Sequence, residues 1–284
     1  MSSYIPQLTT NEIKAYPLAC ELEYLTQQAV AHCDADDGVV DGIISNIASC
    51  DFDPFTQVDS SFLCFSTGDN KTLTGYFNSH GDHIWPGWNY GANITALGYA
   101  PNETNEAANA QRTPNWLVQY YLERNADFDS ATITHEGFDS HWKRFITIYD
   151  DTIGTSDPDL SDFKATGGKM ITWHGTADED IQTKSTERYY QEVTKLFPDV
   201  QDFYRYFESP GSGHCGYTGI GGQLTTVFDA LRAWVENGTA PDVLPVRFNG
   251  TTGVVQHRNL CLYPLNQVYK GSGDLSSPDS FHCV

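Results

Sequence analysis

The most constraining feature of the sequence is an alternation of short apolar segments and amphipathic segments between residues 169 and 238. Residues 169–173 and 203–207 read as short buried strands, and each is followed by apolar residues at helical spacing. The helices are expected over 185–197 and from Val227 to Gly238, because glycine commonly follows the last turn of a helix. Strand, helix, strand, helix at this spacing predicts βα units on a parallel sheet, and therefore an α/β fold. In the first helix we expect Tyr189, Val193, Leu196 and Phe197 to face inward, and Phe228, Leu231, Trp234 and Val235 mark the second.

Outside this region the sequence predicts fewer regular elements. Residues 12–32 have apolar positions at helical spacing and predict a helix that leads to Cys33. Another helix is expected to begin with Thr113 as its N-cap and Pro114 at its first position. Its single apolar face would carry Trp116, Leu117, Tyr120 and Tyr121. The tail from residue 239 is expected to be loop-like.

The cysteine pattern bears on the cellular compartment. None of the seven cysteines forms a Cys-x-x-Cys pair, so a tetrahedral zinc site is not expected. Five Asn-x-Thr sequons favour a secreted glycoprotein, yet the N-terminal residues have neither the basic nor the apolar region of a signal peptide. The odd number of cysteines also leaves one thiol without an internal partner. Both observations would be explained if the chain were the later part of a longer secreted protein. The sequons lie at Asn70, Asn93, Asn102, Asn237 and Asn249.

The charge of the chain excludes several classes of partner. There are 37 acidic and 16 basic residues, which give a formal net charge of −21. Such a chain repels phosphate groups, so neither nucleic acid nor an anionic membrane is an expected partner. No stretch approaches the ~18 consecutive apolar residues of a membrane span. Hydrophobic residues make up 39% of the chain, which is enough to build a folded core.

Residues 34–42 (DADDGVVDG) hold four carboxylates and two glycines. Like charges packed this closely disfavour ionisation, and a Ca²⁺ ion would relieve the repulsion by accepting carboxylate and carbonyl oxygens. The pattern is not an EF-hand, because its glycines are out of register and Ser45 stands where a glutamate is required. A bridge between Cys33 and Cys50 would hold the ends of the loop together, a contribution on the order of 3 kcal/mol. The alternative is an acidic surface turn; we favour the calcium site.

Two side chains suited to acid–base chemistry follow the predicted strands. Asp178 lies four residues beyond the His174-Gly175 pair that ends the first strand, and His214 lies in a glycine-rich loop after the second. In a nucleophilic triad the carboxylate would orient the imidazole and stabilise its protonated form. The alternative is that Asp178 caps the next helix and His214 is an ordinary loop histidine. We expect His174 to be a structural residue at the strand end, and Asp180 is the fallback acid.

The sequence offers no convincing nucleophile. The motif Gly-x-Ser-x-Gly is absent from the 284 residues. The sequence closest to this motif is residues 64–68, which contain Ser66, but no buried strand precedes that segment and no apolar helix follows it. Ser212 is only two residues from His214, and Cys215 is adjacent to it, so neither is well placed to meet the imidazole. We therefore expect the nucleophile to be missing from this chain.

Four segments together resemble the tannase/feruloyl esterase family of fungi and bacteria. Residues 33–54 (CDADDGVVDGIISNIASCDFDP) resemble its calcium-loop segment, and residues 84–93 (IWPGWNYGAN) fit its lid region. Residues 167–181 (GGKMITWHGTADEDI) and 207–219 (FESPGSGHCGYTG) look like its acid and histidine segments. The resemblance extends from about residue 17 to about residue 240.

The resemblance implies a partial α/β-hydrolase core with a large inserted lid domain. The lid and calcium loop would occupy residues 1–166, and the C-terminal part of the core with its tail would occupy residues 167–284. The family arrangement implies that Asp178 is the acid and His214 the base. It also implies that Cys215 pairs with an upstream cysteine next to the serine. The implied calcium ligands are the side chains of Asp34, Asp37 and Asp41 and the carbonyls of Val39 and Ile43. The implied disulfides are Cys33–Cys50 and Cys261–Cys283, which leaves Cys20–Cys64.

The expected function is therefore that of a carboxylic ester hydrolase that cleaves phenolic-acid esters by a Ser-His-Asp mechanism. The chain would be a fragment that lacks the serine and is inactive alone. Its partners would be a phenolic ester substrate and the missing N-terminal part of the same extracellular enzyme. The alternative is a non-catalytic secreted module that binds calcium or carbohydrate. That alternative explains the acidity, sequons and aromatic residues, but gives no reason for Asp178 and His214 on successive loops.

Overall fold

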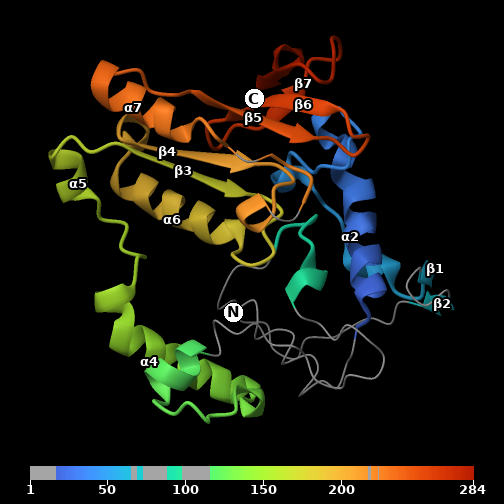
Figure 1. Ribbon diagram of the computed structural model, residues 1–284, viewed down its shortest axis with the longest axis vertical. Helices are drawn as coiled ribbons and strands as arrows, with labels where there is room; N and C mark the ends of the chain where they lie inside the picture. The colour runs from blue at the N-terminus through green and yellow to red at the C-terminus, as the bar shows by residue number, and fades with distance from the viewer. Residues whose placement is uncertain (1–16, 65–68, 73–87, 98–115, 217–218, 223) are drawn as a thin grey trace. The chain divides into compact units, whose positions relative to one another are not determined.

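The two apolar segments of the βα pattern form a pair of parallel strands in the computed structural model (Figure 1). Strand β3 spans Met170–Gly175 and strand β4 spans Tyr204–Ser209, and the first residues of the two strands pair with each other. Helix α6 (Thr183–Leu196) connects them, and helix α7 (Val227–Asn237) follows and ends at Gly238 in the left-handed conformation. The predicted α/β alternation and parallel pairing are confirmed.

The structure describes residues 17–64, 69–72, 88–97, 116–216, 219–222 and 224–284. Its contacts divide the chain into two units. The first comprises residues 1–24, 55–85 and 94–157, and the second comprises residues 25–54, 86–93 and 158–284. The segment that carries the acidic loop thus belongs to the same unit as the βα region. The division into a lid (1–166) and a core (167–284) stays a prediction.

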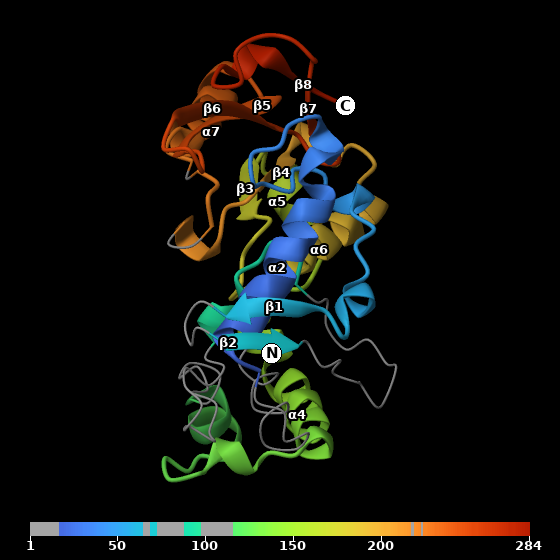
Figure 2. The same cartoon turned by 90° about the vertical axis from the view of Figure 1, so that its right-hand side faces the viewer.

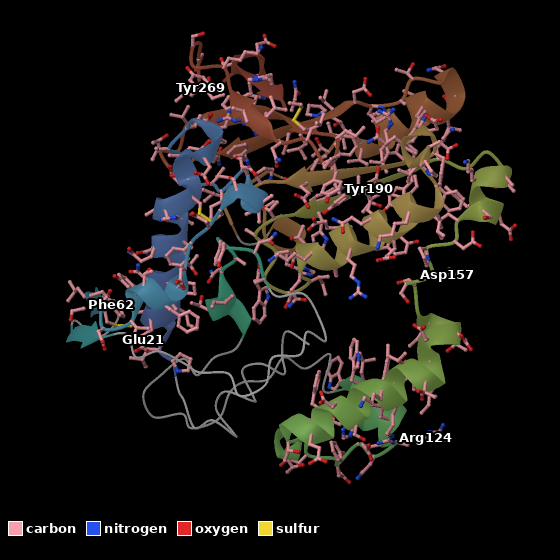
Figure 3. The ribbon with its side chains drawn as sticks, turned by 180° about the vertical axis from the view of Figure 1, so that it is seen from behind. Glu21, Phe62, Arg124, Asp157, Tyr190 and Tyr269 are labelled. Atoms are coloured by element: carbon pink, nitrogen blue, oxygen red, sulfur yellow. A yellow bond between two sulfur atoms is a disulfide. The ribbon has the colours of Figure 1, made fainter. Side chains whose placement is uncertain are left out.

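One face of the β3–β4 pair packs against helix α6. Tyr204 and Tyr206 of β4 point to this face, where they form a buried cluster with Tyr190 and Val193 of the helix. The ring of Tyr190 packs edge-on against that of Tyr204, with ring centroids 5.0 Å apart. Tyr190 is labelled in Figure 3, on the helix beside the strands. Because side chains alternate along a strand, the residues between these tyrosines point to the opposite face.

The opposite face packs against a second, antiparallel pair of strands. Strand β5 (Val243–Asn249) pairs with β6 (Val255–Cys261), and strand β7 (Gln267–Tyr269) pairs with β8 (Phe281–Cys283) (Figure 2). The buried cluster on this face contains Phe207, Leu244, Val246, Leu260 and Leu262. The prediction of a loop-like tail from residue 239 is therefore wrong. Burial alternates along β5 at Leu244 and Val246, but β6 contains four consecutive polar residues, of which Arg258 is buried, so its sequence does not have the pattern of a strand.

One predicted inward position of α6 is wrong, and part of the apolar stripe of α7 is exposed. In α6, Val193 is fully buried but Leu196, in the last turn, is 54% exposed. In α7, Trp234 is buried and Val227 packs against the core, whereas Phe228 and Val235 are exposed. Only the stripe that faces the sheet is covered, and a neighbouring apolar residue lies outside it.

The first helix in the described residues is α2, Ala19–Cys33, and residues 12–16 of the predicted helix lie outside them. Short 3-10 helices follow at Asp34–Asp37, Ile47–Ser49 and Pro54–Gln57. Strands β1 (Ser61–Cys64) and β2 (Asp69–Thr72) then form an antiparallel pair. The disulfides Cys20–Cys64, Cys33–Cys50 and Cys261–Cys283 are present as predicted, and Cys215 is free.

The region predicted to hold one helix after Thr113 is built differently. Thr113 and Pro114 lie outside the described residues. After them, a π-helical segment spans Leu117–Leu122, and Trp116, Leu117, Tyr120 and Tyr121 are all more than a third exposed.

The remaining elements are α4 (His135–Ile153), α5 (Ser161–Ala165) and short 3-10 helices at Ile94–Leu97, Ser130–Thr132, Val200–Asp202, His214–Gly216 and Pro278–Ser280. Across the described ranges, no helix has the length and hydropathy to cross a membrane.

Candidate active site

The loops that follow β3 and β4 leave the same edge of the strand pair, because the strands are parallel (Figure 1). Three hydrogen bonds join the two loops. The Thr176 amide donates to the Ser209 carbonyl at 2.9 Å, and the Ala177 amide donates to the Ser212 carbonyl at 3.0 Å. The Gly211 amide donates to the Thr176 hydroxyl at 3.0 Å. These bonds hold the acid loop and the histidine loop side by side.

Gly175 makes this close approach possible. A Cβ atom added at this position would lie 2.1 Å from the carbonyl oxygen of Ser212. That distance is far below van der Waals contact, and the obstructing atom belongs to the backbone. The glycine of the His174-Gly175 pair is therefore required by the packing of the two loops.

Asp178 and His214, the predicted acid and base, are in contact. Nδ1 of His214 lies 3.2 Å from Oδ2 of Asp178 and 3.3 Å from Oδ1. The carboxylate is 7% exposed and the imidazole 37% exposed. Because the carboxylate can only accept, Nδ1 carries the proton and Nε2 of the neutral ring remains free to accept one. This is the arrangement that a general base requires.

Asp178 is held by further donors. The amides of Asp180 and Ile181 donate to its Oδ1 at 2.9 and 2.7 Å, and Nε2 of His174 lies 3.2 Å from its Oδ2. Burial acts to raise the pKa of Asp178, but the hydrogen bonds from His174, Ile181 and His214 outweigh it and hold that pKa below its ordinary value. The carboxylate is therefore ionised at neutral pH. The two backbone bonds lie in the loop before α6, whose N-cap is Gln182 without a side-chain cap, so Asp178 does not cap the next helix.

Two other acidic residues lie beside the pair. Asp180, the fallback acid, has Oδ2 3.9 Å from Nε2 of His214, too far for a hydrogen bond. Glu179 was not predicted. Its side chain is buried, and its Oε2 accepts from the backbone amide of His214 at 3.2 Å, while its carbonyl accepts from the indole of Trp88 at 2.8 Å. Nothing in the sequence distinguishes Glu179 from the acidic residues on either side of it.

The nucleophile remains unassigned. Ser212 is fully buried and directs its hydroxyl to the Gly222 carbonyl, 3.5 Å away, rather than to His214. Cys215 is exposed and has a left-handed backbone with φ 48°. Ser66 lies outside the described residues. Within the part of the chain that the structure describes, His214 makes no hydrogen bond to a serine hydroxyl.

In the acidic loop, two carboxylates accept hydrogen bonds from backbone amides of the same loop. The carboxylate of Asp34 is buried and accepts from the amides of Asp41, Gly42 and Ile43 at 3.0, 2.9 and 3.3 Å. The carboxylate of Asp37 is also buried and accepts from the Val39 amide at 2.9 Å. The five predicted ligands therefore belong to one loop, residues 34–43, which these hydrogen bonds hold together.

The charge of this loop is only partly neutralised by the protein. Arg258, a buried residue of β6, has Nη2 3.5 Å from Oδ2 of Asp41. Burial and the neighbouring Asp37 nevertheless raise the pKa of Asp41 to about 6, and burial raises the pKa of Asp37. The donors are the hard oxygens that suit Ca²⁺. Over the described ranges, however, no three acidic, histidine or cysteine side chains converge on one point as metal ligands.

Comparison with known proteins adds to this geometry. A family model described as "Tannase and feruloyl esterase" matches residues 5–284. The chain belongs to the tannase and feruloyl esterase family. The resemblance inferred from the motifs is thus confirmed across nearly all of this tannase/feruloyl esterase chain.

Two relatives and one solved structure illustrate the range of the tannase and feruloyl esterase family. A probable feruloyl esterase of Arthroderma benhamiae is 33% identical over 300 residues, which cover 98% of this chain and 55% of that protein. A mono(2-hydroxyethyl) terephthalate hydrolase of Piscinibacter sakaiensis is 30% identical and matches 93% of this chain and 51% of its own length. The structure of a tannin acyl hydrolase from Aspergillus niger matches the whole chain and 56% of its own, with a TM-score of 0.82 and 24% identity. The predicted α/β-hydrolase fold class is confirmed by this likeness.

The chain spans about half the length of the tannase and feruloyl esterase relatives that it matches. The activities and substrates of those longer proteins are therefore proposals for this chain.

Proposed function

We propose that this chain carries the acid and base of a serine-type carboxylic ester hydrolase, with Asp178 as the acid and His214 as the base. The observation that carries the proposal is the contact of Nδ1 of His214 with the buried carboxylate of Asp178. Membership of the tannase and feruloyl esterase family supports it.

In the proposed reaction, Nε2 of His214 takes the proton of a serine hydroxyl as the oxygen attacks the ester carbonyl. Asp178 stabilises the imidazolium that forms and keeps the ring oriented. The same nitrogen then returns the proton to the leaving alcohol. Water follows the same route to release the acid and restore the serine. The partial exposure of His214 gives Nε2 access to these groups.

The proposal places the nucleophilic serine outside these 284 residues. The absence of a Gly-x-Ser-x-Gly motif supports this, as does the burial of Ser212 away from His214. The chain alone would then be inactive, and an N-terminal part of the same enzyme would be its partner.

The proposed substrates are esters of phenolic acids. The names of two relatives specify feruloyl and terephthalate esters. Ferulic acid carries its carboxyl group on a propenoic side chain of the ring and terephthalic acid directly on the ring, so a pocket for an acyl group that contains an aromatic ring is the simplest shared requirement.

We further propose that the loop from Asp34 to Ile43 binds Ca²⁺. The ligands would be the side chains of Asp34, Asp37 and Asp41 with the carbonyls of Val39 and Ile43. The partly uncompensated negative charge of the loop supports this, since a bound cation would neutralise it. The ion would stabilise the loop and would take no part in ester cleavage.

The proposed location is extracellular, and the chain is proposed to be glycosylated. Three disulfides support an oxidising compartment. The sequon residues Asn93, Asn237 and Asn249 are exposed and accessible to glycosylation.

The test uses the longest reading frame that contains these residues, expressed as one protein and assayed with a methyl ester of ferulic acid. We expect turnover, together with labelling of one serine by a fluorophosphonate. Both should be lost in His214→Ala and retained in His257→Ala, an exposed histidine of β6. The 284-residue chain alone should show neither. A reading frame without His214-dependent turnover contradicts the hydrolase, and turnover by the chain alone contradicts an external serine.

A further inference from the structure

A second histidine contacts the carboxylate of Asp178. His174 is the fifth residue of β3, and its side chain is 13% exposed. Its Nε2 lies 3.2 Å from Oδ2 of Asp178 and 3.0 Å from the carbonyl oxygen of Ile181. Its Nδ1 lies 2.8 Å from the hydroxyl of Thr186 on helix α6. Both ring nitrogens therefore have a fixed partner.

The partners determine where the proton of a neutral ring resides. Both groups that face Nε2 can only accept, so Nε2 must carry a hydrogen. The Thr186 hydroxyl can donate to Nδ1, and no other acceptor for its proton is found within the described part of the chain. A neutral imidazole that donates from Nε2 and accepts at Nδ1 satisfies all three partners at once.

We propose that His174 is a positioning residue for the acid–base pair. Held by Thr186 as the neutral Nε2–H tautomer, it donates to Asp178 and fixes the carboxylate in the orientation that receives Nδ1–H of His214. The inference rests on the proposed roles of Asp178 and His214, and it adds a role that the strand-end position of His174 alone does not imply. The ring links the acid to helix α6, so the helix determines how the carboxylate is presented.

Three acidic residues lie on the elements that surround the ring of His174. Asp178 faces His174 from the loop after β3, Glu208 is its partner in the register of β4, and Glu187 follows Thr186 on α6. Burial raises the pKa of Glu208, and its Oε1 accepts from the Tyr206 hydroxyl at 2.9 Å.

Two substitutions distinguish the roles of the two ring nitrogens of His174. The side-chain amide of His174→Gln reaches the position of Nε2 and can still donate to Asp178. The amide of His174→Asn reaches only the position of Nδ1, so Asp178 loses a donor. We expect His174→Asn to lower the acid dissociation constant of Asp178 about tenfold, as the loss of one hydrogen bond to a charged group implies. We expect His174→Gln to leave it near the wild-type value.

The tautomers provide a second readout. Long-range ¹H–¹⁵N spectra of the ¹⁵N-histidine-labelled chain distinguish protonated from unprotonated ring nitrogens. In the wild type, His174 should be the Nε2–H tautomer and His214 the Nδ1–H tautomer. Thr186→Val, which removes the hydroxyl with little change in volume, should leave Nδ1 without its donor and the ring less firmly held, so the hydrogen bond to Asp178 weakens and the acid dissociation constant of that carboxyl falls. Thr194→Val is the matched control, because its hydroxyl lies on the same helix and donates to the Tyr190 carbonyl at 2.8 Å.

The proposal is overturned if His174 is doubly protonated at neutral pH, or if His174→Asn leaves both the Asp178 titration and the His214 tautomer unchanged. Equal effects of His174→Asn and His174→Gln would indicate a purely structural role. If the histidine variants fail to fold, a lower acid dissociation constant of Asp178 in Thr186→Val but not in Thr194→Val supports the proposal, and equal values in the two variants overturn it. These measurements need no ester turnover, so the proposed hydrolase activity can fail without affecting their outcome.

Discussion

The imidazole of His214 and the carboxylate of Asp178 are in contact although 36 positions separate them in the chain, with Nδ1 3.2 Å from Oδ2. The same carboxylate also accepts from two backbone amides and faces His174. A buried carboxylate with this many donors is fixed in position and stays ionised. The acid is therefore oriented before any substrate arrives.

The first prediction concerns the pH dependence of stability. Because the pKa of Asp178 is lower in the folded chain than the ordinary value of 3.8, its ionised form favours the folded state. This contribution is complete above about pH 5 and is lost as the pH falls through the folded pKa. The excess stability of the wild type over Asp178→Asn should therefore be constant near neutral pH and shrink in acid.

Urea unfolding between about pH 7 and pH 3 measures this difference. Asp127→Asn, at an exposed position, is the control and should show no such trend. A gap between wild type and Asp178→Asn that stays the same down to the lowest pH would contradict the hydrogen bonding of Asp178.

The second prediction concerns Gly175. The Cβ of Gly175→Ala would lie 2.1 Å from the Ser212 carbonyl oxygen, so the two loops must separate. We expect a loss of roughly 1–3 kcal/mol in the free energy of unfolding, the usual range for overpacking. Gly250→Ala is the control, because its Cβ would come no closer than 3.2 Å to a neighbour and its nearest contact is the side chain of Gln256. Similar losses in both variants would show that the close approach of the two loops at Gly175 does not determine the loss of stability.

The third prediction concerns Glu179, whose carboxylate holds the backbone of the histidine loop. Glu179→Ala removes the acceptor of the His214 amide, whereas Glu179→Gln keeps an oxygen that can accept. Hydrogen exchange of the His214 amide should be about tenfold faster in the alanine variant, as expected for the loss of one hydrogen bond. It should be close to wild type in the glutamine variant. Unchanged exchange in Glu179→Ala would mean that the loop is held by other contacts.

The fourth prediction concerns calcium. If the acidic loop binds Ca²⁺, a concentration 100 times the Kd stabilises the folded chain by about 2.7 kcal/mol, and a chelator removes that gain. Asp34→Asn should abolish most of the effect on Tm. Asp36→Asn should not, because Asp36 lies in the same loop but is exposed and hydrogen-bonds to Ser49 instead. A Tm that does not respond to calcium, or responds equally in both variants, would exclude the proposed site.

Much of the local structure was predictable from the sequence. The strands at 170–175 and 204–209 and the end of α7 at Gly238 follow from patterns that depend on neighbouring residues. The strands after residue 239 were missed because β6 contains four consecutive polar residues, and because these strands acquire a buried face only by packing on β3 and β4. The exposure of Phe228 could not be predicted either, since the sequence of a helix does not show which of its apolar residues the sheet covers.

The sequence by itself determined the chemical groups of this protein: the acid and histidine on successive loops, the acidic turn, the cysteines and the family to which they belong. Only the tertiary structure decided which groups meet. The parallel pairing of β3 and β4 brings Asp178 to His214, and the helix between them brings Thr186 to His174. Glu179 acquires its role because the two loops are joined through their backbones. The physical reason is that a hydrogen bond depends on distance and direction in space, and for residues this far apart these are set by how the strands and helices pack.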